Sequence, residues 1–147
     1  MLKVQKKLNY IYTLNGVYLD EVNTQKDLGI LISDDLSPRN HIIDIVKKSN
    51  QRVGMIKKCF TNLTAKKITT LYTTMIRSVL EYGASTWSPY FKKDIDLLEG
   101  VQNRCLRLSN EEIFLQFLYQ RRLFTDLCEV YKYMHGYYKS GAEELFH

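Results

Sequence analysis

The chain of 147 residues is 45% apolar and 25% charged, a balance that excludes an intrinsically disordered protein and suits one globular core. Lys and Arg outnumber Asp and Glu by 21 to 16, which fits a polyanionic partner but also many proteins that bind none. No apolar run reaches the roughly 18 residues of a membrane span, and the N-terminus lacks the apolar region of a signal peptide. We therefore expect an intracellular protein, cytoplasmic or nuclear, that does not contact a membrane.

The first part of the chain, residues 8–33, has the spacing of β-strands. Asn15-Gly16 is the strongest short hairpin signal, and Val17 to Leu19 would form the returning strand. A third strand is expected from Leu28 to Ile32, entered through residues 24–27. These features predict a small antiparallel β-hairpin or three-stranded sheet.

After Pro38 the apolar residues recur at a period near 3.6, which predicts helices. We expect four of them, over residues 39–60, 65–85, 92–108 and 110–136. Thr64 is the expected N-cap of the second helix and Asn110 of the fourth, and Gly136 ends the fourth. The predicted fold is α+β and mostly α, in a single domain of residues 1–147. Its small sheet lies beside a bundle of about four helices over residues 39–136.

Asp34-Asp35 is the first candidate for a catalytic site, because paired aspartates hold the magnesium ions of polymerases. The pair lies in Ile-Ser-Asp-Asp-Leu-Ser-Pro between a predicted strand and a predicted helix, where turn and cap formation explains it better. The three histidines are scattered, and a local hydrogen bond explains the pair His41 and Asp44 better than a metal site does.

The remaining motifs give no sign of catalysis either. The three cysteines are widely spaced without a C-x-x-C pair, so they are expected to be reduced core residues. No phosphate-binding glycine loop and no nucleophile motif occurs. We therefore predict no catalytic residue, no metal and no cofactor in this chain.

A group of basic residues on the first predicted helix is the main candidate for binding. It comprises Lys47, Lys48, Arg52, Lys57 and Lys58. Cations at helical spacing can follow the phosphates of a nucleic-acid backbone, although a solvated helix surface gives the same pattern. More lysines lie near predicted helix starts, where the helix dipole disfavours cations and a partner would compensate: Lys66, Lys67, Lys92 and Lys93.

Aromatic residues offer a second kind of contact. Tyr82 and Trp87 are candidates for stacking on bases, whereas Tyr72 falls on the apolar face of its helix and is predicted to be core. Tyrosines are dense near the C-terminus, at positions 131, 133, 137 and 138. If exposed, they would give the fourth helix a surface for a protein partner.

Four segments, in this order, carry a resemblance to a known family: KDLGILISDDLSP (26–38), HIIDIVKKSNQRVGMIKK (41–58), RSVLEYGASTWSP (77–89) and KKDIDLLEGVQNRCLRL (92–108). Over roughly residues 12–136 the chain resembles the region that follows the catalytic palm in non-LTR (LINE-like) retrotransposon reverse transcriptases. In that family this region leaves the palm as a hairpin and then forms a helical thumb, which grips the template–primer duplex by its backbone.

The resemblance implies that the five basic residues of the first helix contact the backbone of an RNA–DNA or DNA duplex. It also implies that magnesium and catalysis belong to the palm, because the Tyr/Phe-Ala-Asp-Asp motif of the family is absent from this chain. A loop that the family usually has after the third helix is also missing between Leu108 and Asn110. Three hypotheses therefore stay open: a noncatalytic thumb-like module, a helical protein-interaction module, and a decayed element fragment without selected activity.

Overall fold

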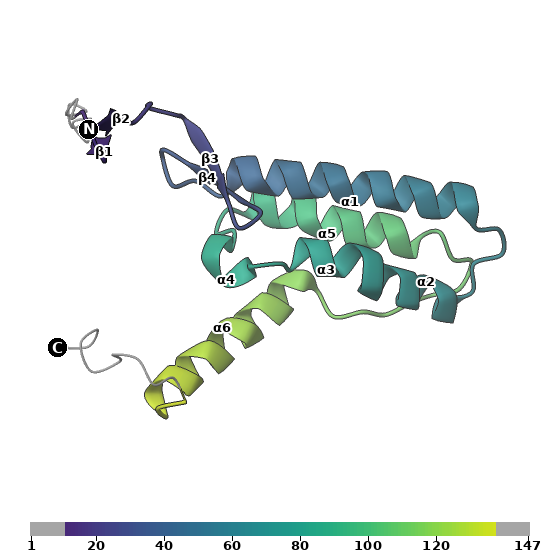
Figure 1. Ribbon diagram of the computed structural model, residues 1–147. Helices are drawn as coiled ribbons and strands as arrows, with labels where there is room; N and C mark the ends of the chain where they lie inside the picture. The colour runs from purple at the N-terminus through teal and green to yellow at the C-terminus, as the bar shows by residue number, and fades with distance from the viewer. Residues whose placement is uncertain (1–10, 138–147) are drawn as a thin grey trace, which may run out of the picture.

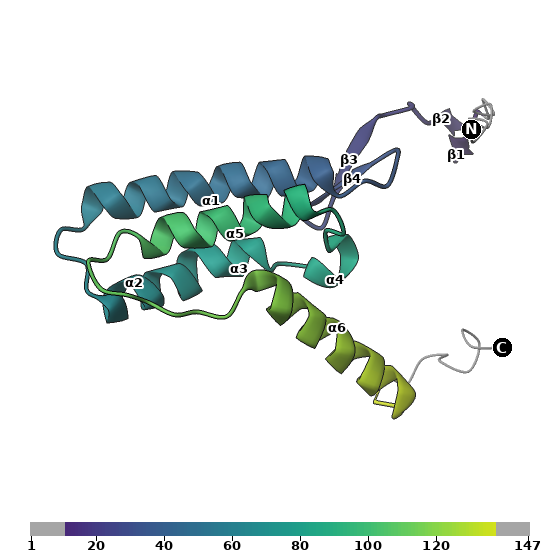
Figure 2. The same ribbon diagram turned by 180° about the vertical axis from the view of Figure 1, so that it is seen from behind.

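Two short β-hairpins precede a set of helices that run alongside one another (Figures 1 and 2). This computed structural model describes residues 11–137. The fold is α+β and mostly α, as predicted. The strands form two separate two-stranded antiparallel sheets, so the alternative of one three-stranded sheet is wrong.

The first hairpin forms where it was predicted. Strand β1 (Thr13–Leu14) pairs with β2 (Val17–Tyr18), and Asn15 and Gly16 turn between them with φ of 51° and 81°. Both residues are in the left-handed region, which is the geometry of the tight turn that Asn-Gly favours. The part of the predicted segment at residues 8–10 lies outside the described residues.

The second hairpin differs from the expected single strand. Thr24–Asp27, predicted to be an entry segment, is itself strand β3, and it pairs with β4 (Ile30–Ser33). Leu28, predicted to lie in a strand, instead occupies the turn beside Gly29, with φ of 45° and 88°. A turn of this kind folds the two strands against each other, so that the backbone N–H groups of one strand bond to the backbone C=O groups of the other.

Helix α1 (Arg39–Cys59) matches its prediction closely. Pro38 precedes its first residue, and the backbone becomes extended at Phe60. The predicted apolar face is buried over Ile42, Ile45, Val53 and Ile56, with Val46 half-buried beside it. Phe60, expected on the same face, is exposed because it lies beyond the end of the helix.

The second predicted helix is divided into parts. It contains α2 (Ala65–Leu71), a π-helical segment η1 (Tyr72–Arg77) and α3 (Ser78–Leu80), and after a turn the short helix α4 (Ala84–Trp87) follows. Gly83, expected inside a continuous helix, has φ of +61° and breaks it. The turn carries Trp87 into the core, where its indole N–H donates to the Tyr82 carbonyl at 2.8 Å.

Helix α5 (Lys92–Leu106) is close to its prediction, but α6 (Leu118–Met134) starts eight residues later than expected. Residues 107–117 form a connecting segment that runs back along the bundle (Figure 1). In that segment Ile113 and Leu115 pack against the core and Phe114 between them is exposed, an alternation typical of extended chain. Gly136, with φ of +67°, follows the end of α6 as predicted.

The core lies between α1, the α2–η1–α3 segment and α5. Its buried apolar residues are Ile42, Ile45, Val53, Ile56, Ile68, Tyr72, Ile76, Leu80, Trp87, Leu98, Val101, Cys105 and Leu118. All three cysteines are free, as predicted, but the expectation that all are core residues holds for Cys105 alone. Burial raises the pKa of the Cys105 thiol to about 11, whereas Cys59 is exposed and Cys128 half-buried.

Candidate nucleic-acid interface

The five predicted basic residues do not form one continuous face of α1. At about 100° per residue, Lys47 and Lys58 lie within about 20° of each other on the outer side of the helix. By the same measure Lys57 is about 80° from Lys47, and Arg52 about 140° from it. The four lysines are exposed and Arg52 is half-buried. Lys47 and Lys58 therefore share one side of α1, about 16 Å apart along its axis, and Arg52 lies on another side.

Arg52 has a structural contact. Its Nη1 donates to the Met75 carbonyl at 2.5 Å, which joins α1 to the π-helical segment η1. A π-helical turn changes the hydrogen-bonding register of a helix, so its carbonyls are natural acceptors for an outside donor. A guanidinium that already donates into the bundle has less capacity to bind a phosphate.

Lys48 is partly neutralised by its own helix. Its Nζ lies 2.5 Å from Oδ2 of Asp44, one turn earlier; the Lys48 side chain is well exposed to solvent and that of Asp44 partly exposed. Such a surface pair contributes only about 0.3 to 0.5 kcal/mol, so a phosphate can compete for the ammonium group. Among the described residues, Lys47, Lys57 and Lys58 form no ion pair.

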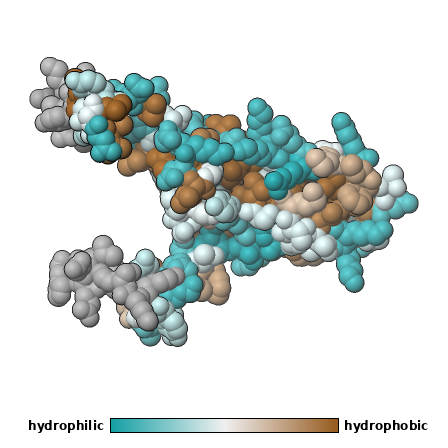
Figure 3. All heavy atoms as spheres, in the orientation of Figure 1, coloured by the Kyte–Doolittle hydropathy of each residue, from teal (hydrophilic) through white to brown (hydrophobic). Residues whose placement is uncertain are grey.

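More cations gather at one end of the bundle than along the α1 face. Helices α1 and α5 end there and α2 begins there, so three segments distant in sequence meet (Figures 1 and 2). We name the cations of these segments the basic end: Lys57, Lys58, Lys66, Lys67, Arg104 and Arg107. In Figure 3, hydrophilic side chains project around an apolar patch at this end of the molecule.

A groove of about 510 Å³ opens in the basic end. Lys57 and Arg107 line it together with the polar residues Asn62, Thr64 and Asn110, so two helix ends and both connecting segments contribute. Glu111 and the apolar residues Phe60, Leu63 and Leu108 complete the lining. Lys57 and Arg107 are the groups of this lining that can bind phosphate oxygens.

Glu111 holds the groove together from the connecting segment. Its Oε2 accepts a hydrogen bond from the Ala65 backbone N–H at 3.3 Å, at the start of α2. Thr64 occupies the predicted N-cap position, but its side chain makes no capping bond, so Glu111 satisfies this end of the helix instead. Asn110 does not cap a fourth helix as expected, because the neighbouring Glu111 bonds to the start of α2 and α6 begins only at Leu118.

Charge at the basic end is strongly unbalanced. The segments 57–67 and 103–117 contain its six cations and two acidic residues, Glu111 and Glu112. Their formal charge is six minus two, or +4. Cations in the last turns of α1 and α5 are stabilised by the helix dipoles. Lys66 and Lys67 lie in the first turn of α2, where the dipole disfavours them by about 0.3 to 1 kcal/mol each.

Sequence reasoning did not assign Arg104 or Arg107 to the interface. The signal that was present is their spacing of three residues at the end of a predicted helix. Arg104 Nη1 donates to the Asn50 side chain, so it joins α5 to α1 while remaining exposed. They lie near Lys57 because α5 runs alongside α1 in the same direction, and no local sequence pattern predicts that arrangement.

The aromatic candidates belong to the protein interior more than to its surface. Tyr72 is buried as predicted, its hydroxyl donates to Gln102 Oε1 at 2.6 Å, and desolvation raises the pKa of its hydroxyl. Trp87 is buried too, which leaves neither ring a free face for a base. Tyr82 is exposed, and its hydroxyl donates to the Leu28 carbonyl at 3.2 Å, so it supports the second hairpin.

The paired aspartates form a turn. Asp35 Oδ1 accepts from the Ser37 backbone N–H at 2.9 Å, just before α1 begins, which is the structural role that the sequence predicted. Within residues 11–137, no group of three His, Cys, Asp or Glu side chains is arranged to hold a metal ion.

His41 also has a structural role, with a partner other than the predicted Asp44. Its Nδ1 accepts from the Leu31 backbone N–H at 3.2 Å, and its ring lies edge-on to Trp87 with centroids 4.9 Å apart. Burial lowers its pKa below the ordinary value of 6.5, because desolvation outweighs the favourable charge of Asp44. Neutral His41 therefore joins strand β4 to helix α1.

Comparison with protein-family models, with curated proteins and with solved structures returns no match to this chain. In the described part of the chain, the helices are too short or too polar to cross a membrane.

Proposed function

We propose that this chain is a thumb-like module of a non-LTR retrotransposon reverse transcriptase, which grips a nucleic-acid duplex by its backbone. The observation that carries the proposal is the basic end, where three segments contribute six cations and two of these, Lys57 and Arg107, line one groove. The sequence resemblance supports it, because the resembled region holds the template–primer duplex. The role is grip, and the chemistry belongs to another part of such an enzyme.

The proposed mechanism is electrostatic. The apolar core holds the ends of α1, α2 and α5 in fixed positions, so their cations are already gathered before a duplex arrives. Phosphate oxygens then replace counterions along the duplex, and the release of those ions supplies most of the binding free energy. Contacts of this kind set position and not base sequence, so we expect little sequence specificity.

A pair of matched variants tests the proposal. The basic-end variant carries Lys57→Gln, Lys58→Gln, Lys66→Gln and Lys67→Gln. The control variant removes the same charge elsewhere, through Lys47→Gln, Lys48→Gln, Lys92→Gln and Lys93→Gln. Both have a formal net charge of +5 minus 4, or +1, so a difference between them reports position and not total charge.

The measurement is fluorescence-anisotropy titration of a labelled RNA–DNA hybrid across a salt series. Wild-type affinity should fall linearly with salt on logarithmic axes, and each lost phosphate contact should reduce the slope by about 0.9. We expect the basic-end variant to lose most of the slope and the control variant to keep it. Equal loss in both variants would refute a localised basic end, and no binding by the folded wild-type chain would refute the proposed function.

A further inference from the structure

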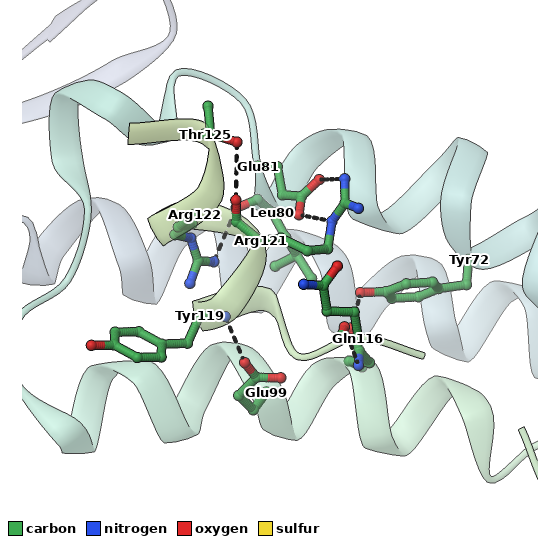
Figure 4. Close-up of polar contacts among 10 residues, drawn as sticks. Tyr72, Leu80, Glu81, Glu99, Gln116, Tyr119, Arg121, Arg122 and Thr125 are labelled. Carbon is green, nitrogen blue, oxygen red and sulfur yellow. Dashed lines mark hydrogen bonds and ion pairs between the residues drawn. The ribbon is translucent and has the colours of Figure 1, made fainter. Parts of the chain in front are cut away.

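Helix α6 is attached to the bundle by its first turns. Leu118 is buried in the core, and the Tyr119 backbone N–H donates to Glu99 Oε1 at 2.9 Å. Arg121 Nε lies 2.7 Å from Glu81 Oε1, and the guanidinium of the buried Arg122 lies 5.6 Å from the centroid of the Trp87 ring. Figure 4 shows the polar contacts that converge on this part of α6.

Beyond Arg122 the helix projects away from the bundle, on the side remote from the basic end (Figures 1 and 2). Its exposed part carries a row of apolar residues at steps of four, three and four: Leu123, Leu127, Val130 and Met134. Phe124 and Tyr131 lie along one side of this row and are exposed too. We name these six residues the α6 seam. The steps sum to 11 residues over three, an average of about 3.7, so the row stays on one side of the helix along its length.

Exposure of the α6 seam is large. Leu127 is 69% exposed and Met134 is 77% exposed, so the described residues leave the row uncovered. At about 100 Å² for each side chain, the seam presents on the order of 600 Å² of apolar surface. Single exposed apolar residues are ordinary in proteins, whereas a continuous patch of this size marks an interaction surface.

We propose that the α6 seam pairs with the α6 seam of a second copy of this chain, in an antiparallel arrangement about a two-fold axis. Two copies would bury at most about 1,200 Å², enough to reach the roughly 1,000 Å² expected of a specific interface. A two-fold interface uses the same surface on both partners, so one self-complementary helix is enough. This inference is independent of the proposed nucleic-acid role.

The antiparallel direction follows from how α6 is attached. Each bundle adjoins the N-terminal turns of its α6, so a parallel pair would place two positively charged bundles at the same end of the interface. An antiparallel pair places them at opposite ends and leaves both basic ends free. It sets Leu127 opposite Val130 of the partner subunit, and Leu123 opposite Met134 of the partner subunit.

The seam is also free of charge along its length. Asp126 is the acidic residue beside it, and it lies about 140° around the helix from Tyr131, on the flank of the row away from Phe124 and Tyr131. Lys132 and Glu129 face away from the row and form a pair within the helix, with Nζ and Oε1 2.7 Å apart. A second copy therefore meets apolar residues along the row itself.

The test is light scattering coupled to size-exclusion chromatography over a hundredfold range of protein concentration. We expect the mass of the wild-type chain to rise from 17.4 kDa toward twice that value. Leu127→Glu and Met134→Glu should each hold the chain at one copy, because pairing would bury an unmatched charge. Thr125→Glu is the control, since Thr125 lies about 200° around the helix from Leu127 and should still pair.

Both glutamate substitutions in the seam are at well-exposed positions, so the variants should retain the helical circular-dichroism spectrum of the wild type. A wild-type chain that stays at 17.4 kDa at every concentration would overturn the proposal. So would a mass that rises equally in Leu127→Glu and Thr125→Glu, because the seam would then be uninvolved.

Disulfide trapping tests the direction. Chains carrying Leu123→Cys and chains carrying Met134→Cys are mixed in equal amounts, in a background with Cys59→Ser and Cys128→Ser. The antiparallel pair predicts that disulfides between the two different chains predominate. Disulfides formed mainly between identical chains would overturn the antiparallel arrangement.

Discussion

Replacing Arg52 separates the structural role of a basic residue from a binding role on the same helix. Arg52→Gln removes the hydrogen bond from Nη1 to the Met75 carbonyl, which is 2.5 Å long and half-buried. A hydrogen bond from a charged donor contributes about 1.5 to 3 kcal/mol, and partial exposure lowers this to about 1 to 2 kcal/mol. For a chain of 147 residues this corresponds to a melting temperature lower by roughly 2 to 8 °C.

The matched substitution is Lys58→Gln, at an exposed position that makes no ion pair with the described residues. It should lower the melting temperature by no more than roughly 1 to 3 °C, through the lost interaction with the dipole of α1. It should weaken duplex binding by up to about eightfold at 0.1 M salt, the effect of one lost phosphate contact. Thermal unfolding followed by circular dichroism and anisotropy titration measure the two effects. The reasoning is refuted if Arg52→Gln weakens binding as much as Lys58→Gln does, or leaves the melting temperature unchanged.

Three further predictions concern the scaffold. Gly83→Ala should cost about 1 to 3 kcal/mol in urea unfolding, because φ is +61° and the new Cβ would lie 2.8 Å from Ile30 Cδ1, and Ile30→Val should reduce that cost. Stability should fall as the pH drops below about 6.5, since the unfolded chain protonates His41 more readily, and His41→Asn should lack this component. Tyr72→Phe should cost about 1 to 3 kcal/mol in urea unfolding by leaving buried Gln102 Oε1 unpaired.

The sequence predicted best those elements whose pattern is continuous and local. Helix α1 has an unbroken apolar face and a proline before its start, so its bounds were correct to one residue. Asn15-Gly16 specified the first hairpin through the conformational preferences of its own two residues. Each of these signals lies within the segment that it determines.

The misplaced boundaries have causes outside the local pattern. Gly83 sits at a position that fits the apolar period of a helix, and its break is fixed by packing against Ile30 of the second hairpin. Residues 113–115 fit a helical period equally well, but Glu111 is held by α2 and Ile113 by the core, which keeps the chain extended. Tertiary contacts decided these segments, and local propensity did not.

The candidate interface was predictable in residue type and less so in arrangement. Lys57 and Lys58 were identified from the sequence, and they remain part of the interface that we propose. Arg52 looked equivalent to them until its acceptor, a carbonyl on a different helix, was known. The arginines of α5 join the lysines of α1 through the order of the helices in the bundle, which periodicity does not reveal.

Protection of lysines from acetylation tests the central claim most directly. The chain is acetylated with and without a saturating RNA–DNA hybrid, and the modification of each lysine is measured by mass spectrometry. We predict strong protection at the four lysines of the basic end, positions 57, 58, 66 and 67, and unchanged reactivity at Lys92 and Lys93. Protection that is absent from the basic end, or equal at Lys92 and Lys93, would contradict a duplex grip located there.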